Sequence, residues 1–374
     1  MPGEPRDSSP LRNPALAGLA AAVLLAGGVG VLAFIAGGEP DPVTAAADIA
    51  RTAPETSAST ELAEADPFAD APVDGVTLPG VEDTETALAA APVAAPRRPQ
   101  APPAPVSGLY EPGPGGPLPV IAADGRRPDQ VYAKPFDGVA EAPTIAVVVG
   151  GLGLSEPLTR RAIEALPSEV TLSFAAYSEN LQTLIDLARA DGHEVLIELP
   201  MEPFDYPNND PGPQTLLLDA AAEENRRRLM TLLSRAAGYA GTANYLGARL
   251  GASEPAMTWL FTELEARGLT MIHDGAGRRG VIDGAAGAAG ARVAIADRVL
   301  DSDPDPSAID ARLLELEALA LQNGTSLGSG FAYPATVETV ASWAEGLAAR
   351  GYQLAPASYL VTARRNRAAA DAET

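Results

Sequence analysis

The chain has 374 residues, which at about 150 residues per domain leaves room for two domains. Its net charge of -23 argues against a nucleic-acid partner and against attraction to anionic lipid, because both require a basic surface. The absence of cysteine excludes disulfides and thiolate catalysis, and the presence of only two histidines excludes a three-histidine zinc site.

The first predicted element is an apolar segment, residues 14–38, which carries no charged residue and is long enough to cross roughly 30 Å of hydrocarbon. Arg6 and Arg12 precede it and acidic residues follow it, so residues 1–13 are expected in the cytoplasm and the bulk of the chain in the periplasm. A cleavable signal peptide is the alternative, but its apolar core is usually shorter. We therefore expect a single-pass protein of the inner membrane.

Residues 39–142 have a different composition, rich in proline and alanine and poor in aromatic residues. Such a segment cannot bury enough apolar surface to offset the entropy lost on ordering, so it is predicted to be a disordered linker. Residues 366–374 are predicted to be a disordered tail. The foldable part of the chain is then a single domain, residues 143–365.

Within this domain, strand and helix patterns alternate along the chain. The predicted strands cover residues 144–149, 170–174, 195–199, 242–246, 269–273, 292–295, 326–328 and 353–356. The predicted helices cover residues 155–166, 179–190, 219–237, 254–267, 306–322 and 336–350, with Asp219 and Ser253 as N-caps of the third and fourth. This alternation predicts a parallel α/β domain, and seven or eight units favour a distorted (β/α) barrel with its chemistry at the carboxyl ends of the strands.

The residues at these strand ends, read in order, resemble the divergent polysaccharide deacetylase family, a branch of the NodB-type carbohydrate esterases. The resemblance covers residues 144–361, and its most specific parts are ELPMEP, beginning at Glu198, and LDSDPDP, beginning at Leu300. It implies a deformed (β/α) barrel of the polysaccharide-deacetylase type. The related active deacetylases use a metal-bound water to remove acetyl groups from N-acetylated sugars.

The chain departs from the family pattern at the positions that the resemblance assigns to the acidic base and the metal ligands. The first family strand ends in Asp-Asp-Leu-Gly, and this chain has Gly150 and Gly151 in place of the two aspartates. The family histidine of Asn-Asn-His-x-Gly-Ser-Arg is Tyr245, and both histidines of Gly-His-Pro-His-Pro are aromatic residues, Phe331 and Tyr333. A divalent ion needs several such ligands together, so we expect no metal, no other cofactor and no catalytic residue of the family type.

Other residues at the strand ends keep polar side chains. Glu202 could accept hydrogen bonds from a sugar or from a backbone, and Asn244 and Asp274 remain as polar candidates for the pocket. Arg249 could bind a ligand carboxylate or form a salt bridge with Asp274 or Glu202. Asp301 begins a D-x-D-x-D run that lacks the remaining features of an EF-hand loop, so we expect these acids to interact with the N-terminus of the following helix.

The sequence supports neither a nucleotide-binding enzyme nor a serine hydrolase. Gly150-Gly151-Leu152-Gly153 lacks the later glycine of a dinucleotide-binding loop and the lysine of a phosphate-binding loop, and no serine has a recognisable histidine partner. Three hypotheses remain. The domain is a catalytically inactive module that binds a glycan, such as peptidoglycan, at the pocket candidates above; or it is a carbohydrate esterase with an atypical site; or it is a scaffold for an envelope protein.

Overall fold

The computed structural model describes residues 103–139 and 141–372. The predicted cytoplasmic residues 1–13, the predicted anchor 14–38 and most of the predicted linker lie outside the described residues. None of the helices in the described ranges combines the length and the apolar character that a membrane crossing requires.

The centre of the domain is a parallel sheet. Its strands are β3 (Thr144–Leu152), β4 (Thr171–Ala175), β5 (Val195–Met201), β6 (Gly241–Leu246), β7 (Thr270–His273), β8 (Val293–Ile295), β9 (Arg298–Val299), β10 (Thr325–Phe331) and β11 (Gln353–Leu354). Their order is β8-β7-β6-β5-β4-β3-β10-β9, and β11 pairs with the beginning of β3. The predicted alternation of strands and helices is therefore confirmed.

The two edges of this sheet are formed by neighbouring parts of one segment. β8 pairs with β7, and β9, only two residues later, pairs with β10 at the other edge. The backbone amide of Ala296 donates to His273 O over 2.8 Å, and the amide of Asp297 donates to Leu327 O over 2.7 Å. The parallel sheet thus curls into a half-barrel whose edges are bridged by this segment, which is consistent with the expected deacetylase-type barrel.

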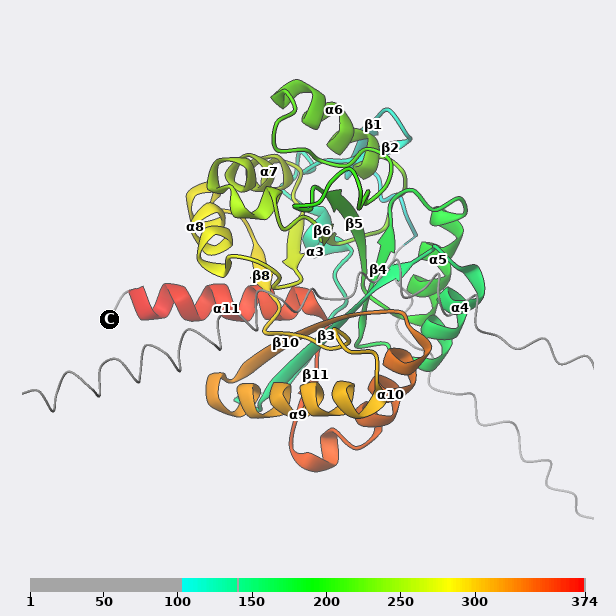
Figure 1. Cartoon of the computed structure of the whole chain (residues 1–374), viewed down its shortest axis with the longest axis vertical. Coiled ribbons are helices and arrows are strands. Elements are labelled where there is room, and N and C mark those ends of the chain that lie inside the picture. The colour runs from blue at the N-terminus through cyan, green and yellow to red at the C-terminus, as the bar shows by residue number, and fades with distance from the viewer. Residues whose placement is uncertain (1–102, 140, 373–374) are drawn as a thin grey trace, which may run out of the picture. The chain divides into compact units, whose positions relative to one another are not determined.

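Helices surround the sheet (Figure 1). They are α4 (Glu156–Ala165), α5 (Leu181–Asp191), α6 (Ala222–Leu233), α7 (Glu254–Ala266), α8 (Arg279–Ala289), α9 (Pro306–Asn323), α10 (Pro334–Glu345) and α11 (Ala357–Ala372), with short 3-10 turns at Leu250–Ala252 and Ala348–Arg350. Ser253 caps α7 as predicted, by accepting from the amide of Ala256. Asp219 caps no helix, because α6 begins after Ala221. The predicted tail from residue 366 is helical as far as Ala372.

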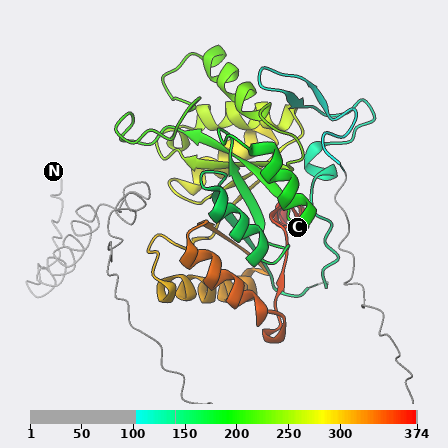
Figure 2. The same ribbon diagram turned by 90° about the vertical axis from the view of Figure 1, so that its right-hand side faces the viewer.

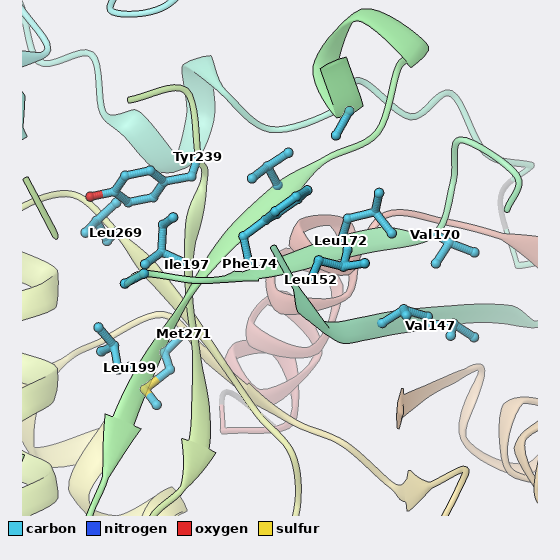
Figure 3. Close-up of a cluster of buried hydrophobic side chains, with 14 of the residues drawn as sticks. Val147, Leu152, Val170, Leu172, Phe174, Ile197, Leu199, Tyr239, Leu269 and Met271 are labelled. Atoms are coloured by element: carbon cyan, nitrogen blue, oxygen red, sulfur yellow. The ribbon is translucent and has the colours of Figure 1, made fainter. Parts of the chain in front are cut away.

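Alternate residues of the strands pack in two different hydrophobic clusters. Ile145, Val147 and Val149 of β3 belong to the cluster between the sheet and the helices, part of which Figure 3 shows. Ala146 and Val148 point to the opposite face and belong to a smaller cluster inside the curled sheet. This inner cluster also contains Leu360 and Val361 of α11, so α11 covers the amino-terminal end of the curled sheet.

The end of the predicted linker is ordered, which corrects the domain boundary near residue 143. We call residues 103–139 the N-terminal strap; it contains β1 (Tyr110–Pro112), β2 (Pro117–Pro119) and α3 (Pro128–Val131). Figure 2 shows this segment, in cyan, along one side of the domain. Asp129 of the strap pairs with Arg127 and Arg292, and Lys134 Nζ donates to Gly192 O over 3.0 Å. These contacts give a proline-rich segment enough buried partners to be ordered.

Candidate functional site

A cavity of about 50 Å³ opens where the strands end, and we call it the strand-end cavity. It lies at the carboxyl ends of β3, β5, β6, β7 and β10, which is the edge where parallel α/β folds place their ligands. Its lining residues are Val148, Gly150, Ser173, Glu198, Ala243, Asn244, Ile272, Asp274, Val299, Ser329, Gly330 and Phe331. Four of the predicted pocket residues, Gly150, Asn244, Asp274 and Phe331, are therefore brought together.

Glu198 is the charged group closest to the strand that lacks the two family aspartates. Its side chain is 5% exposed, and its Oε1 accepts a hydrogen bond of 2.6 Å from the amide of Gly151. A Cβ on Gly150 would lie 2.4 Å from this oxygen, so the carboxyl group of Glu198 fills space that any side chain at position 150 would need. Burial raises the pKa of Glu198 to about 8, against the opposing effect of the Gly151 hydrogen bond.

Ser173 supplies a second buried polar group to the strand-end cavity. Its side chain is 1% exposed, and its hydroxyl has no hydrogen-bond partner among the described residues. It lies on β4, which pairs directly with β5, the strand of Glu198. Because buried hydroxyl groups are almost always hydrogen-bonded, this unpaired hydroxyl marks a position that a water molecule or a ligand can satisfy.

The polar residues on the opposite side of the cavity are held by their neighbours. Asn244 Oδ1 accepts from the amide of Asp274 over 2.8 Å, and Asn244 Nδ2 donates to Leu246 O over 2.8 Å. Ser329 Oγ donates to the backbone carbonyl of Asp274 over 3.1 Å. Asp274 Oδ1 accepts from the amide of Ala276 over 2.8 Å. Asp274 is thus held through its backbone amide, its backbone carbonyl and its carboxylate.

Three aromatic residues at the strand ends form a row of rings, which we call the aromatic row, and its middle ring, Phe331, lines the cavity. The ring centroids of Tyr245 and Phe331 are 6.1 Å apart with the planes at 81°, and those of Phe331 and Tyr333 are 6.0 Å apart with the planes at 45°. All three are half-buried. Gly151 lies against the row, since a Cβ there would be 3.1 Å from Phe331 Cδ1.

Asp301 fixes the backbone of Phe331, the middle residue of this row. It is buried, and its Oδ2 accepts from the amide of Phe331 over 2.6 Å and from Thr336 Oγ1 over 2.8 Å. Burial raises its pKa, against both hydrogen bonds. Asp301 therefore does not interact with the N-terminus of α9 as predicted, where Asp305 is the capping residue.

Glu202 and Arg249 do not line the strand-end cavity. Arg249 forms salt bridges with Glu202 and with Asp219, and Glu202 Oε2 also accepts from the amide of Leu218 over 2.6 Å. Glu202 is 3% exposed, so this pair fixes the loop after β5. Of the two predicted roles of Arg249, the geometry matches the salt bridge with Glu202, and it leaves the guanidinium already engaged by two carboxylates.

No group of three or more His, Asp or Glu side chains in residues 103–139 and 141–372 is arranged to hold a metal ion. The two histidines lie apart from each other in the fold. His193 is buried between Val170 O and Ile163 O, at 2.9 and 3.1 Å. His273 is buried at the end of β7, with its Nδ1 3.3 Å from Asp274 Oδ1.

The family model of the divergent polysaccharide deacetylases matches residues 147–361. The chain belongs to the divergent polysaccharide deacetylase family. A crystal structure of the uncharacterized protein ATU2773 from Agrobacterium tumefaciens C58 is 38% identical, with a TM-score of 0.64, over 66% of this chain and 99% of that chain.

A curated relative is more distant. The uncharacterized protein YibQ of Escherichia coli (strain K12) is 24% identical over 199 residues, which are 53% of this chain and 61% of YibQ. A solved structure described as a mutant of BA3943, a CE4 family pseudoenzyme with restored enzymatic activity, matches 65% of this chain and 75% of that chain with 12% identity and a TM-score of 0.35.

Glu198 was not among the residues singled out from the sequence. A signal was present, because Glu198 is the one charged residue within the otherwise apolar strand VLIELPM. A charged side chain in a strand that is buried along its whole length must point into a polar cavity or find partners there. That rule, applied strand by strand, would have found it.

Proposed function

We propose that this domain binds a glycan at the strand-end cavity and the aromatic row, without metal-dependent hydrolysis. The observation that carries the proposal is the aromatic row itself. Tyr245, Phe331 and Tyr333 stand at positions that the family resemblance assigns to histidines, and they lie ring to ring beside the cavity. Flat aromatic faces offer apolar contact area to the C–H face of a sugar ring, while the cavity offers hydrogen-bonding groups.

Membership of a carbohydrate-active family supports a glycan over other ligands. The lack of a metal-holding group of side chains in the described ranges supports binding over hydrolysis, because a hydrolytic metal needs three protein ligands and an open position. The alternative, an atypical carbohydrate esterase, would have to activate water with the carboxyl groups of Glu198 or Asp274 alone.

We also propose that residues 14–38 anchor the chain in the inner membrane and place this domain in the periplasm. The proposal rests on the charge distribution around that apolar segment, since the segment lies outside the described residues. A reporter enzyme that is active only in the periplasm, fused after Thr374, should be active. Activity of a reporter that works only in the cytoplasm would contradict the proposal.

The binding proposal is tested by calorimetric titration of the full chain with chitin-derived oligosaccharides in the presence of a chelator. Phe331→Ala should weaken binding about tenfold or more, because Phe331 joins the other two rings and lines the cavity. Tyr110→Ala is the matched control, since Tyr110 is 45% exposed on β1, outside the cavity lining. Equal binding by wild type and Phe331→Ala, or no binding by wild type, would overturn the proposal.

A further inference from the structure

We infer that the strand-end cavity binds a primary ammonium group, so that the preferred ligand is a glycan with free amino groups and not an N-acetylated one. The inference rests on the proposed function and names the ligand class of the same site. It follows from the charges of the cavity, from an unpaired hydroxyl and from the aromatic row, which are taken in turn below.

The charges of the cavity lining are all acidic. Glu198 and Asp274 line it, and none of the described lining residues is Lys, Arg or His. Arg249, the cation nearest in sequence to Asn244, is paired with Glu202 and Asp219. A carboxylate ligand would therefore meet two acids and no cation, whereas an ammonium group would gain charge-assisted hydrogen bonds.

Among the described residues, one buried hydroxyl of the cavity lacks a hydrogen-bond partner, and the Glu198 carboxyl group, on the neighbouring strand, has one backbone donor. The amide of Gly151 donates to Oε1 of Glu198, and burial keeps this carboxyl group protonated in the free protein. Ser173 Oγ, 1% exposed, has no partner in the described ranges. An ammonium group brings three donors and no acceptor, and Glu198, Ser173 and Asp274, which all line this cavity, are the acceptors that we propose for it.

The volume of the cavity and the aromatic row agree with an ammonium group as the ligand. A volume of about 50 Å³ has room for an amino group, since a cavity needs about 10–15 Å³ by this measure to hold one water molecule. Phe331 lines the cavity, and the aromatic row presents ring faces, which attract cations as well as sugar C–H groups.

Binding of an ammonium group in this position is linked to a proton. Glu198 faces Tyr177 at the end of β4 and Asp274 beyond β7, while β3 and β6 present the uncharged Gly150 and Asn244. Burial keeps Glu198 protonated below about pH 8 in the free protein. A bound ammonium favours the carboxylate, so the carboxylic acid and the ammonium ion give an ion pair and one proton leaves to solvent.

The test compares the fully deacetylated glucosamine tetramer with its N-acetylated counterpart by calorimetry on the full chain. It is done near pH 6, in buffers of different ionisation enthalpy, so that both affinity and proton release are measured. The glucosamine tetramer should bind about tenfold or more tightly than the acetylated tetramer and should release close to one proton. The inference is overturned if wild type binds the acetylated tetramer as tightly as the glucosamine tetramer, or more tightly. It is also overturned if binding of the glucosamine tetramer releases no proton.

A substitution isolates the role of Glu198. Glu198→Gln keeps an acceptor for the amide of Gly151 but cannot ionise, so it should weaken binding of the glucosamine tetramer about tenfold or more and abolish proton release. Glu223→Gln is the matched control, because the side chain of Glu223 is 86% exposed on α6. A far-UV circular dichroism spectrum like that of wild type and a cooperative unfolding transition show that each variant is folded, and wild-type affinity in Glu198→Gln would contradict the inference.

The outcomes separate this inference from the proposed function. Binding of the acetylated tetramer that depends on Phe331 but not on Glu198 keeps the glycan site and overturns the ammonium site. Binding of neither tetramer overturns both. Binding of glucosamine that depends on both Phe331 and Glu198 supports both.

Discussion

Gly150 leaves open the space that the carboxyl group of Glu198 occupies: a Cβ on Gly150 would lie 2.4 Å from Glu198 Oε1. The two residues are 48 positions apart and meet only because β3 and β5 flank β4 in the sheet. The glycine at a position where the family resemblance expects an aspartate is thus matched to a glutamate on another strand. This relationship means that a side chain at position 150 and the observed position of the Glu198 carboxyl group exclude each other, so the two positions are structurally coupled.

Gly150→Ala should therefore destabilise the fold, by about 1–3 kcal/mol, because the added methyl group collides with a buried carboxyl group. Its free energy of unfolding is measured by urea titration. Glu198→Ala in the same chain should relieve the collision, so the double variant should be more stable than the sum of the two single effects predicts. Gly287→Ala is the control, since that glycine lies within α8 with nothing within 4 Å of an added Cβ. Additive effects of Gly150→Ala and Glu198→Ala would contradict the coupling.

Glu198 should also shape how stability depends on pH. Its pKa is about 8 in the folded protein and near 4.5 when unfolded, so between these values the folded state binds more protons. Stability should then fall as pH rises from about 4.5 to 8, by roughly 5 kcal/mol at 1.36 kcal/mol per pKa unit. Glu198→Gln removes this contribution. Urea unfolding at both ends of the window should show the variant gaining stability relative to wild type as pH rises, and parallel pH profiles would refute the assignment.

Asp129 tests whether the N-terminal strap belongs to the folded domain. Its buried carboxylate pairs with Arg127 and Arg292, and its amide donates to Gly268 O over 2.9 Å. Asp129→Ala leaves Arg292 without this partner and Arg127 with Glu265 as its remaining carboxylate, and should cost about 1–3 kcal/mol. Asp124→Ala is the matched control in the same segment, because Asp124 forms an exposed pair with Arg126 and its loss should leave the melting temperature almost unchanged. Equal melting temperatures for the two variants would mean that the strap does not stabilise the domain.

A substitution of Arg249 distinguishes a structural role of this residue from a role in ligand binding. Arg249→Met leaves Glu202, 3% exposed, without its cation, and should lower the melting temperature while glycan affinity changes less than about twofold. Arg226→Met serves as the comparison, because the Arg226–Glu263 pair is on the surface and Arg226 is half-exposed. Loss of affinity with unchanged thermal stability would assign Arg249 to the ligand instead.

Much of the fold could be predicted from local sequence pattern. The β-branched run beginning at Thr144 and the Ser253 cap each act within a few residues, and both were predicted correctly. Helix α8 was not predicted, because its sequence RGVIDGAAGAA has glycines where a helix pattern needs side chains. The strap was not predicted either, because its order depends on partners as distant as Arg292, 163 residues beyond Asp129.

The candidate site, like the fold, could be predicted from the sequence only in part. The family resemblance led to Gly150, Asn244, Asp274 and Phe331, which the fold brings around one cavity. Whether Arg249 faces a ligand or pairs with Glu202 depends on the path of the loop after β5, which no local pattern specifies. Glu198 could be found as the one charged residue of an apolar strand, but its place in the space that Gly150 leaves is a relation between two strands that no local pattern specifies.

The central claim is that this site binds its ligand without metal chemistry. The most direct measurement is acetate release from acetylated chito-oligosaccharides by the unmodified protein with zinc, cobalt or nickel added, and again with a chelator. We predict no metal-dependent release, because the described ranges hold no group of side chains able to bind the ion and lower the pKa of its water. Acetate release that requires the metal and is abolished by the chelator would contradict the claim.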